Sequence, residues 1–364
     1  MPWGMSFNET TGTFTGTPTE TGEYVVPVRV QTNYGQDQKD VYIVVENPAS
    51  PVYAIGAQAA TWSNNAEPDA YGFRRLPMPN AKKLSALSSG FGAYTVENNW
   101  YVCGVSENYY GQPDMNFTTP KEYPVPDIVE MTGGASSGSS VSYVYMLYRT
   151  KDNKGVIHTL RTTTYSSSER NEVSGVKALN TGYCYGYGYI TEEDRLYAPN
   201  VYGVASSGAV KAIINERNGG NGRIYYVTDD GELYNTLGKI ETTCGKIAKI
   251  YPNYHPLDNY DTFFVLNEQG ELYGIGSNSY CQLGLSDKKS YAALTKSGDY
   301  DVKTISSVRG VSFMLTTDGK LYHTGQKVNN VTDEHEGWTE IYSGMKFIDM
   351  VYTNGANTLV VIKE

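Results

Sequence analysis

The chain of 364 residues carries a net charge of −10, and only 19% of its residues are charged. Its length predicts one small plus one large domain. With 33 tyrosines, 38 glycines and no long Ala-, Leu-, Glu- and Lys-rich stretch, the composition favours strands over helices. The acidic balance argues against a nucleic-acid partner, because phosphates need a basic patch. No apolar run approaches the ~18 residues that cross a bilayer, so we expect no membrane insertion.

Residues 1–46 predict three strands. The first, 12–16, is short, and the second, 23–32, alternates between apolar and polar residues. The third, 39–45, follows a turn predicted at 34–37.

The same segment contains the motifs Thr11-Gly12-Thr13 and Gly16-Thr17-Pro18, followed by Gly22-Glu23-Tyr24. It resembles the putative-immunoglobulin family of bacterial and phage surface proteins. The resemblance implies a β-sandwich, which needs about seven strands, and three strands make only part of one. We therefore predict a partial immunoglobulin-like domain over 1–46, completed by upstream chain or by a partner in a larger assembly. Residues 47–51, with two prolines, predict a short stiff linker.

From Val52 onward a pattern of three strands recurs seven times. Its clearest copy reads Val302-Lys303-Thr304-Ile305, Phe313-Met314-Leu315-Thr316, the turn Asp318-Gly319-Lys320, and Leu321-Tyr322. Turns of this composition predict two-residue hairpins. The third strands begin at Val52-Tyr53, Trp100-Tyr101, Val156-Ile157, Leu196-Tyr197, Leu233-Tyr234, Leu272-Tyr273 and Leu321-Tyr322. Units of ~40 to 50 residues with several strands each are typical of propeller blades, so we predict an all-β fold with a seven-bladed β-propeller over 52–364.

Residues 272–285 read Leu-Tyr-Gly-Ile-Gly-Ser-Asn-Ser-Tyr-Cys-Gln-Leu-Gly-Leu. This sequence, together with the stretch from Val302 to Gly325, resembles the regulator-of-chromosome-condensation family of seven-bladed propellers. Cys281 stands where that family usually has glycine. The resemblance implies that insertions between strands lie on the faces of the ring.

The two ends of the repeat region complement each other. Residues 359–362 match the second strand of the repeat, but no third strand follows them. Residues 52–55 match the third strand of the repeat, but no second strand comes before them. We predict that these two segments pair and close the ring, because closure removes exposed strand edges.

One segment, 182–189, alternates tyrosine with small residues. Alternation predicts a strand with its four tyrosines on one face. That face serves either packing between blades or stacking on a ligand.

The long insertions supply the candidate ligand-binding residues. Tyrosine and tryptophan give large contact area at little entropic cost, which favours recognition. The same side chains would also pin the loops, and both roles stay open. The candidates are Trp62, Tyr71, Phe73, Tyr109, Tyr110, Tyr123, Tyr280 and Trp338.

No pattern of catalysis, metal binding or cofactor binding stands out. Cys103, Cys184, Cys244 and Cys281 form no Cys-x-x-Cys pair, and the four histidines fall at no metal-ligand spacing. We expect small buried thiols, no metal, no cofactor and no enzymatic activity.

The leading hypothesis is a non-enzymatic binding or structural module displayed on a surface. The immunoglobulin-family resemblance favours a phage virion protein, a decoration or tail-associated component that binds protein or glycan on a host cell. A bacterial cell-surface or extracellular adhesin is the alternative. The propeller resemblance implies a third role, nucleotide exchange or enzyme regulation.

Overall fold

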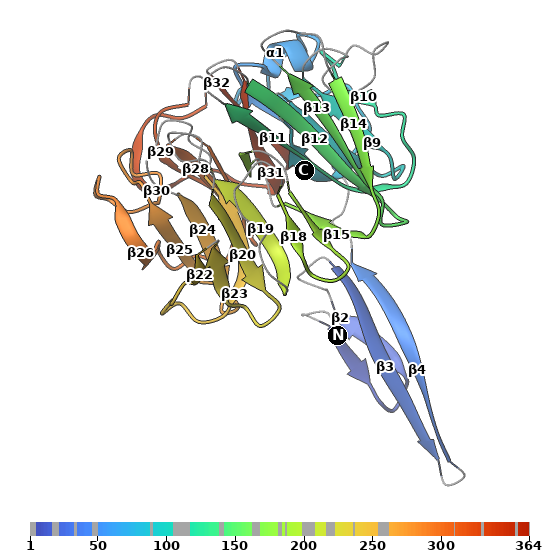
Figure 1. The fold of residues 1–364 in the computed structure, drawn as a ribbon. Coiled ribbons are helices and arrows are strands. Elements are labelled where there is room, and N and C mark those ends of the chain that lie inside the picture. The colour runs from blue at the N-terminus through green and yellow to red at the C-terminus, as the bar shows by residue number, and fades with distance from the viewer. Residues whose placement is uncertain are drawn as a thin grey trace. The chain divides into compact units, whose positions relative to one another are not determined.

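The computed structural model describes residues 5–16, 22–32, 35–45, 50–87, 90–104, 117–137, 142–161, 168–180, 184–185, 188–198, 208–215, 223–235, 237–253, 262–308, 310–328, 331–353 and 356–363. The chain divides into two units, Met1–Ala49 and Ser50–Glu364. Strands dominate both, and within these ranges the one helix, α1 (Ala59–Trp62), is a single turn (Figure 1). The predicted all-β class is confirmed.

The first unit holds four strands rather than the three predicted. β1 (Met5–Asn8) pairs with β2 (Thr13–Gly16), with Phe7 directly opposite Phe14. β1 is missing from the prediction because four half-exposed residues give too short a pattern. β3 (Gly22–Thr32) and β4 (Gly35–Val45) form a long hairpin.

The turn predicted at 34–37 is wrong. Thr32 lies opposite Gly35, so only two residues separate the strands, and Gln36 and Asp37 continue β4. Their turn-like polarity reflects the exposure of this part of the hairpin.

The second unit is a seven-bladed propeller, whose sheets appear in Figure 1 as separate groups of strands in chain order. Blades 1 to 3 are β7 (Ala81–Ala86), β8 (Phe91–Thr95), β9 (Trp100–Cys103), β10 (Lys121–Glu122); β11 (Ile128–Ser137), β12 (Ser142–Thr150), β13 (Gly155–Arg161), β14 (Ser168–Val173); and β15 (Val176–Leu179), β17 (Tyr189–Thr191), β18 (Leu196–Tyr197).

Blades 4 and 5 are β19 (Ala209–Asn215), β20 (Arg223–Thr228), β21 (Leu233–Asn235), β22 (Gly238–Lys239); and β23 (Ile247–Pro252), β24 (Phe263–Asn267), β25 (Leu272–Gly276), β26 (Tyr291–Lys296). Blades 6 and 7 are β27 (Val302–Val308), β28 (Val311–Thr316), β29 (Leu321–Gly325), β30 (His335–Tyr342); and β31 (Met345–Thr353), β32 (Ala356–Lys363), β5 (Val52–Gly56), β6 (Arg74–Arg75).

The third strand of each blade begins at the predicted pair of residues, or one residue before it in β13. Blade 7 combines the two ends of the unit. β5 pairs antiparallel with β32, which places Ile55 opposite Leu359 and Ala54 opposite Val360, all of them buried. This is the pairing that the complementary end strands led us to expect.

The turns between second and third strands are longer than the two-residue hairpins predicted. Each leaves four residues between the strands: 96–99, 151–154, 192–195, 229–232, 268–271 and 317–320. The third residue of each turn has positive φ: Asn98, Asn153, Asp194, Gly231, Gly270 and Gly319. These turns are type I with a left-handed residue after them, for which glycine and asparagine are suited.

The same turns connect neighbouring blades. At Asn153, Asp194, Gly231 and Gly319 the carbonyl of the left-handed residue accepts a hydrogen bond from the first N–H of the next innermost strand. The N···O distances are 2.9 Å for Val176 to Asn153, 2.8 Å for Ile247 to Gly231 and 3.0 Å for Met345 to Gly319. These four turns therefore fix where the following blade begins.

Innermost strands of neighbouring blades run parallel to each other. Lys303 Nζ donates to the carbonyl of Lys346, and Ser306 Oγ donates to Asp349 Oδ1, both at 2.8 Å. The first residues of neighbouring innermost strands therefore lie side by side, and so do the residues in the middle of these strands. It follows that the six second-to-third turns lie at one end of the propeller, the turn end, and the other connections within blades at the opposite, loop end.

The segment 182–189 is not one strand, contrary to the prediction. Its β16 (Cys184–Tyr185) pairs in parallel with β11 of blade 2, whereas Tyr189 already belongs to β17 of blade 3. The free edge of β11 faces the central channel, so β16 lies on the channel side of blade 2. Tyr189 is buried and its ring lies 5.0 Å from that of Tyr197, which is packing.

We predict that the left-handed conformation alone sets the cost of substitutions at Gly270. A Cβ there meets nothing within 4 Å, so Gly270→Ala should lower the free energy of unfolding by about 1 kcal/mol. Gly270→Asn should cost less, because Asn98 and Asn153 occupy the same turn position. Urea unfolding measures both.

Gly319→Ala is the matched variant, since its Cβ would also lie 3.0 Å from the carbonyl of Met345. It should cost more than Gly270→Ala. Equal losses for Gly270→Ala and Gly270→Asn would contradict the assignment.

Candidate functional site

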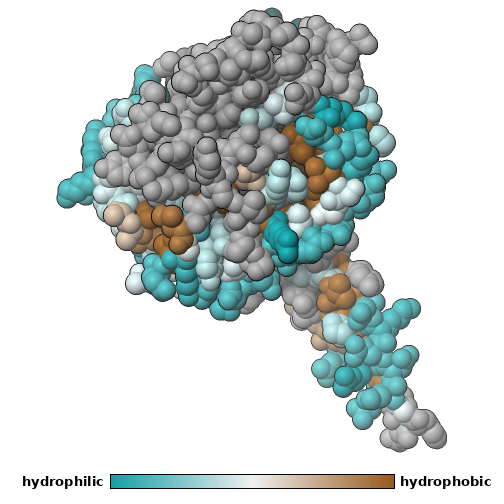
Figure 2. Space-filling model, viewed as in Figure 1, coloured by the Kyte–Doolittle hydropathy of each residue, from teal (hydrophilic) through white to brown (hydrophobic). Residues whose placement is uncertain are grey.

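The aromatic residues proposed from the sequence are placed very differently. Trp62, Phe73 and Tyr123 are buried, Trp338 is half-buried, and Tyr71 and Tyr280 are exposed by 68% and 36%. Tyr109 and Tyr110 lie outside the described residues. Figure 2 shows one face of the molecule, on which hydrophobic residues form small separate patches among hydrophilic ones.

The buried aromatic residues hold insertions against the blades. The ring of Trp62 lies 5.4 Å from that of Phe91, and Tyr123 lies 5.8 Å from Tyr148. Trp338 Nε1 donates to Ser297 Oγ at 2.9 Å. A Cβ on Gly284 would lie 2.0 Å from that nitrogen, so the indole lies directly on the glycine-rich loop.

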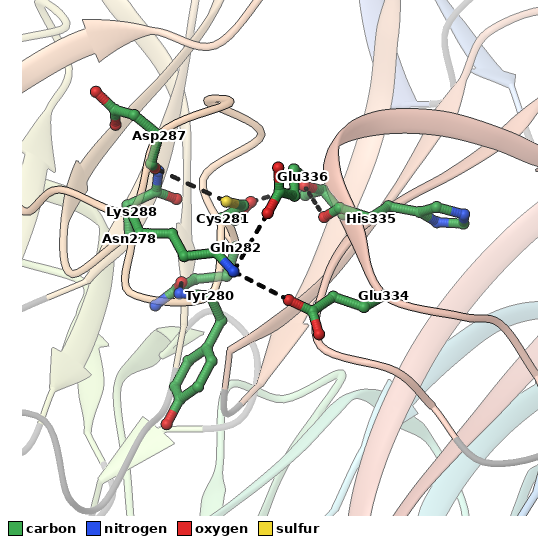
Figure 3. Close-up of polar contacts among 10 residues, drawn as sticks. Asn278, Tyr280, Cys281, Gln282, Asp287, Lys288, Glu334, His335 and Glu336 are labelled. Atoms are coloured by element: carbon green, nitrogen blue, oxygen red, sulfur yellow. Dashed lines mark hydrogen bonds and ion pairs between the residues drawn. The ribbon is translucent and has the colours of Figure 1, made fainter.

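That loop, which follows β25, is organised by the buried side chain of Asn278 (Figure 3). Its Oδ1 accepts from the N–H of Leu283 at 2.8 Å, and its Nδ2 donates to the carbonyls of Leu285, at 3.1 Å, and Asp287. Cys281 has a φ of 61°. This left-handed conformation explains why glycine is usual at that position of the resembling family.

Tyr280 is the exposed aromatic residue of this loop. In Figure 3 its ring points away from Lys288, whose Nζ lies 3.3 Å from both Glu334 and Glu336. Tyr280 lies close to Gly310, where a Cβ would approach its ring to 2.7 Å. Since Gly310 belongs to the connection between β27 and β28, Tyr280 lies at the loop end.

Tyr71 lines a groove at the turn end, where β31 begins and β32 ends. The groove has a volume of about 390 Å³. Its lining comes from the insertion before β6, from the end of β30 and from the last residue of β32: Tyr71, Phe73, Glu340, Ile341, Tyr342, Ser343, Gly344, Met345 and Lys363. We call this the aromatic groove.

Asp69 fixes the backbone that carries the two aromatic residues. Its Oδ1 accepts from the N–H groups of Tyr71 at 2.9 Å and Phe73 at 3.0 Å, and its Oδ2 pairs with Lys363. Partial burial raises the pKa of the Asp69 carboxyl, but the hydrogen bonds from Lys363 and the two N–H groups outweigh burial and bring the pKa below 3.8.

Lys363 and Tyr342 complete the groove. Lys363 Nζ lies 4.6 Å from the ring centre of Tyr53 and 4.8 Å from that of Phe73, which are cation–π contacts. Tyr342 meets Phe73 at 4.9 Å and Tyr71 at 5.9 Å, both edge to face. Burial, and then Asp69, raise the pKa of the Tyr342 hydroxyl. The exposed ring of Tyr71 therefore packs against Tyr342 through one edge-to-face contact.

The sequence pointed to Tyr71 and Phe73 but missed the residues that orient them. Asp69 is recognisable as a turn residue whose side chain bonds the backbone two residues on. Tyr342 and Lys363 carry no local signal, because their contacts join distant parts of the chain.

The groove combines aromatic and charged side chains. An exposed aromatic face lies beside a carboxylate, Glu340, and an ammonium group, Lys363. Among the described residues no cluster of three or more His, Cys, Asp or Glu side chains could hold a metal ion. Cys103, Cys244 and Cys281 are buried thiols that form no disulfide, as expected, while the side chain of Cys184 lies outside the described part. In the described ranges no helix has the length and apolar character to span a membrane.

Comparison with known proteins supports the two-part organisation. A family model described as a putative Ig domain matches residues 1–46. No curated protein matches the sequence. The structure is similar to yeast RCC1 (Prp20) bound to Kap60, with a TM-score of 0.62, 11% identity and coverage of 88% of this chain and 90% of that chain.

Two further solved structures are similar. Prp20p from Saccharomyces cerevisiae gives a TM-score of 0.60 at 12% identity, over 87% of this chain and 92% of that one. Human WBSCR16 gives 0.56 at 11% identity, over 86% of this chain and 100% of that one. At such identities the likeness shows the fold, a seven-bladed propeller, and not the family. A propeller beside an immunoglobulin-family match is an architecture typical of binding modules.

Substitution of Asp69 should separate its two roles in the groove. Asp69→Ala leaves two N–H groups without their acceptor and should cost about 1–3 kcal/mol of unfolding free energy. Asp69→Asn keeps an oxygen acceptor, loses the ion pair to Lys363, and should cost less than about 1 kcal/mol. Chemical denaturation at neutral pH measures both.

The pH dependence provides the control. Because folding lowers the pKa of Asp69, its ionised form stabilises the protein above the unfolded pKa, and this contribution disappears as the pH falls through the lower folded pKa. The gap in unfolding free energy between wild type and Asp69→Asn should have its full size above about pH 4 and should disappear below it. A gap that persists in acid would exclude the ion pair as its cause.

Proposed function

We propose that this protein is a non-enzymatic recognition module that binds a protein or glycan on a cell surface through the aromatic groove. The unit at residues 1–46 would attach the propeller to a larger assembly, for which a phage virion is our first choice. A bacterial cell-surface adhesin is the alternative.

The single observation that carries the proposal is the position of Tyr71. Its side chain is 68% exposed, yet Asp69 fixes its backbone and Tyr342 lies against its ring. An exposed ring held in this way gains little from folding, because most of its surface stays in water. It offers a binding partner a large contact area without losing much side-chain freedom.

The surroundings of Tyr71 favour a polar partner with an apolar face. Glu340 accepts hydrogen bonds, Lys363 donates them, and the ring supplies a flat surface. Sugars and tyrosine- or proline-containing protein loops both have this mixed character. Yeast RCC1, which has a similar fold, is known in complex with Kap60, and this is consistent with a protein partner.

The first test is binding to intact host cells and to a glycan array, with Tyr71→Ala and Tyr280→Ala compared in the same experiment. Tyr71→Ala should weaken binding about tenfold or more, as expected for a central aromatic contact. Tyr280→Ala is the matched control, since it removes an exposed tyrosine at the opposite end. Both variants should unfold like wild type.

A loss of binding with Tyr280→Ala and none with Tyr71→Ala would place the binding site at the loop end and exclude the groove. The assembly is tested separately by mass spectrometry of purified virions from the native source. Stoichiometric amounts of the chain would support a virion component. Its recovery from cell envelopes alone would support the adhesin.

A further inference from the structure

Two histidine side chains meet in blade 6 although 12 residues separate them in the chain. His323 lies in the middle of β29, and His335 is the first residue of β30, which pairs antiparallel with β29. The pairing places Gly325 opposite His335, with an irregularity in the register between Gly325 and His323. The ring centres lie 5.1 Å apart and the two Nδ1 atoms 2.9 Å apart. Strand pairing creates this contact, so no local spacing in the sequence announces it.

The fold does not require a histidine at position 323. His323 is the third residue of the third strand of its blade, and the other blades carry no titratable side chain at that position. The residues there are Ala54, Val102, Ile157, Ala198, Asn235 and Gly274. His323 is fully buried, with its ring 5.0 Å from that of Phe313. Burial of an imidazole is costly unless both of its nitrogens find partners, so a smaller or apolar side chain would serve packing better.

The hydrogen bonds of the pair fix where its protons lie. A backbone carbonyl can only accept, so His323 Nε2, which lies 3.1 Å from the carbonyl oxygen of Gln326, carries a proton. Nδ1 of the neutral His323 ring is then an acceptor, and the proton between the two Nδ1 atoms belongs to His335. Metal-binding histidines are commonly oriented in this way, by a carbonyl that accepts from the ring nitrogen not bound to the metal.

Thr332 places an oxygen atom beside the two nitrogens. Its Oγ1 lies 3.5 Å from Nδ1 of His323 and 3.4 Å from Nδ1 of His335. Two backbone hydrogen bonds between Thr332 and Val328, at 3.0 and 3.1 Å, fix the turn that carries this hydroxyl. Nitrogen atoms bound to one tetrahedral zinc ion at about 2.0–2.1 Å lie roughly 3.3 Å from each other. The two imidazoles therefore need to separate by only about 0.4 Å to hold one ion.

The surroundings of the pair are open to solvent on one side and acidic. Thr332 and His335 are half-buried. Three carboxylates flank His335 in the chain and share the ammonium groups of Lys288 and Lys327, each at 3.3 Å; they are Asp333, Glu334 and Glu336. In Figure 3 the imidazole of His335 points away from the contacts with Lys288. A local excess of carboxylates attracts cations.

We propose that His323 Nδ1, His335 Nδ1 and Thr332 Oγ1 form a binding site for a divalent transition-metal ion, zinc in the first place, with water completing its coordination. Imidazole nitrogens suit zinc, copper and nickel, and zinc takes four ligands. Both rings stay neutral on binding, because the proton of His335 moves from Nδ1 to Nε2 and the Nδ1 lone pair takes up the ion. This site is separate from the aromatic groove and does not depend on the function proposed for it.

The test is calorimetric titration of the full chain, cleared of metal by a chelator and dialysed, with Zn²⁺ and, in a second arm, with Mg²⁺. Zn²⁺ should bind saturably, and Mg²⁺, which prefers oxygen ligands, should give no saturable heat. His335→Gln keeps an N–H donor for His323 but removes one imidazole, and should weaken Zn²⁺ binding about a hundredfold or more, since even residues that only support a ligand contribute about 10- to 100-fold. Thr332→Val should weaken it less, by about tenfold.

His158→Gln is the matched control. His158 is also buried, at 4% exposure, but its Nε2 contacts the hydroxyl of Tyr123, at 3.4 Å, rather than a second histidine. Zn²⁺ binding should therefore be unchanged in this variant. Thermal melting separates lost binding from lost folding: Zn²⁺ should raise the melting temperature of wild type and of His158→Gln, and should leave that of His335→Gln unchanged.

The position of the proton on His335 gives a readout that a purely structural pair would not change. In ¹⁵N-labelled protein, Zn²⁺ should transfer this proton from Nδ1 to Nε2, which correlation spectra of the imidazole nitrogens detect, while His158 stays the same. An absence of saturable Zn²⁺ heat, or equal binding of Mg²⁺, would overturn the proposal. So would undiminished Zn²⁺ binding in His335→Gln, or a loss of affinity in His158→Gln as large as in His335→Gln.

Discussion

The propeller depends on the way each blade sets the start of the next. A four-residue turn places one residue in the left-handed conformation, and its carbonyl receives the first N–H of the following innermost strand, as Gly319 receives Met345. The same contact is made by Asn153, Asp194 and Gly231, so the innermost strands that follow them begin in equivalent register. A single sheet cannot bury both of its faces, and this repeated register lets neighbouring sheets cover each other.

The binding groove that we propose lies where this regularity is relaxed. The aromatic groove lies where blade 7 combines both ends of the unit, and its insertion reaches the outer strand of blade 6 through Tyr342.

Much of the fold could be read from the sequence because the first three strands of a blade are buried and carry strong apolar patterns. Outer strands such as β26 and β30 are half-exposed, so their pattern is weak and they went unpredicted. Aromatic residues in insertions were recognisable, but whether each is buried or exposed was not. Trp62 and Tyr71 look alike in sequence, and only tertiary contacts bury the first and leave the second exposed. The orienting residues Asp69 and Lys363 meet across 294 residues, beyond any local signal.

The closure of blade 7 also constrains the order of events during synthesis. Gln58 donates to Thr358, 300 residues further along the chain, so β5 has no partner on its β32 side until the end of the unit leaves the ribosome. At typical elongation rates this takes roughly 15–60 s. For that time an apolar strand, Val-Tyr-Ala-Ile, presents an unpaired edge, the kind of surface that associates with other chains. Yield of folded protein should therefore respond to the speed of translation and to chaperones that cover strand edges.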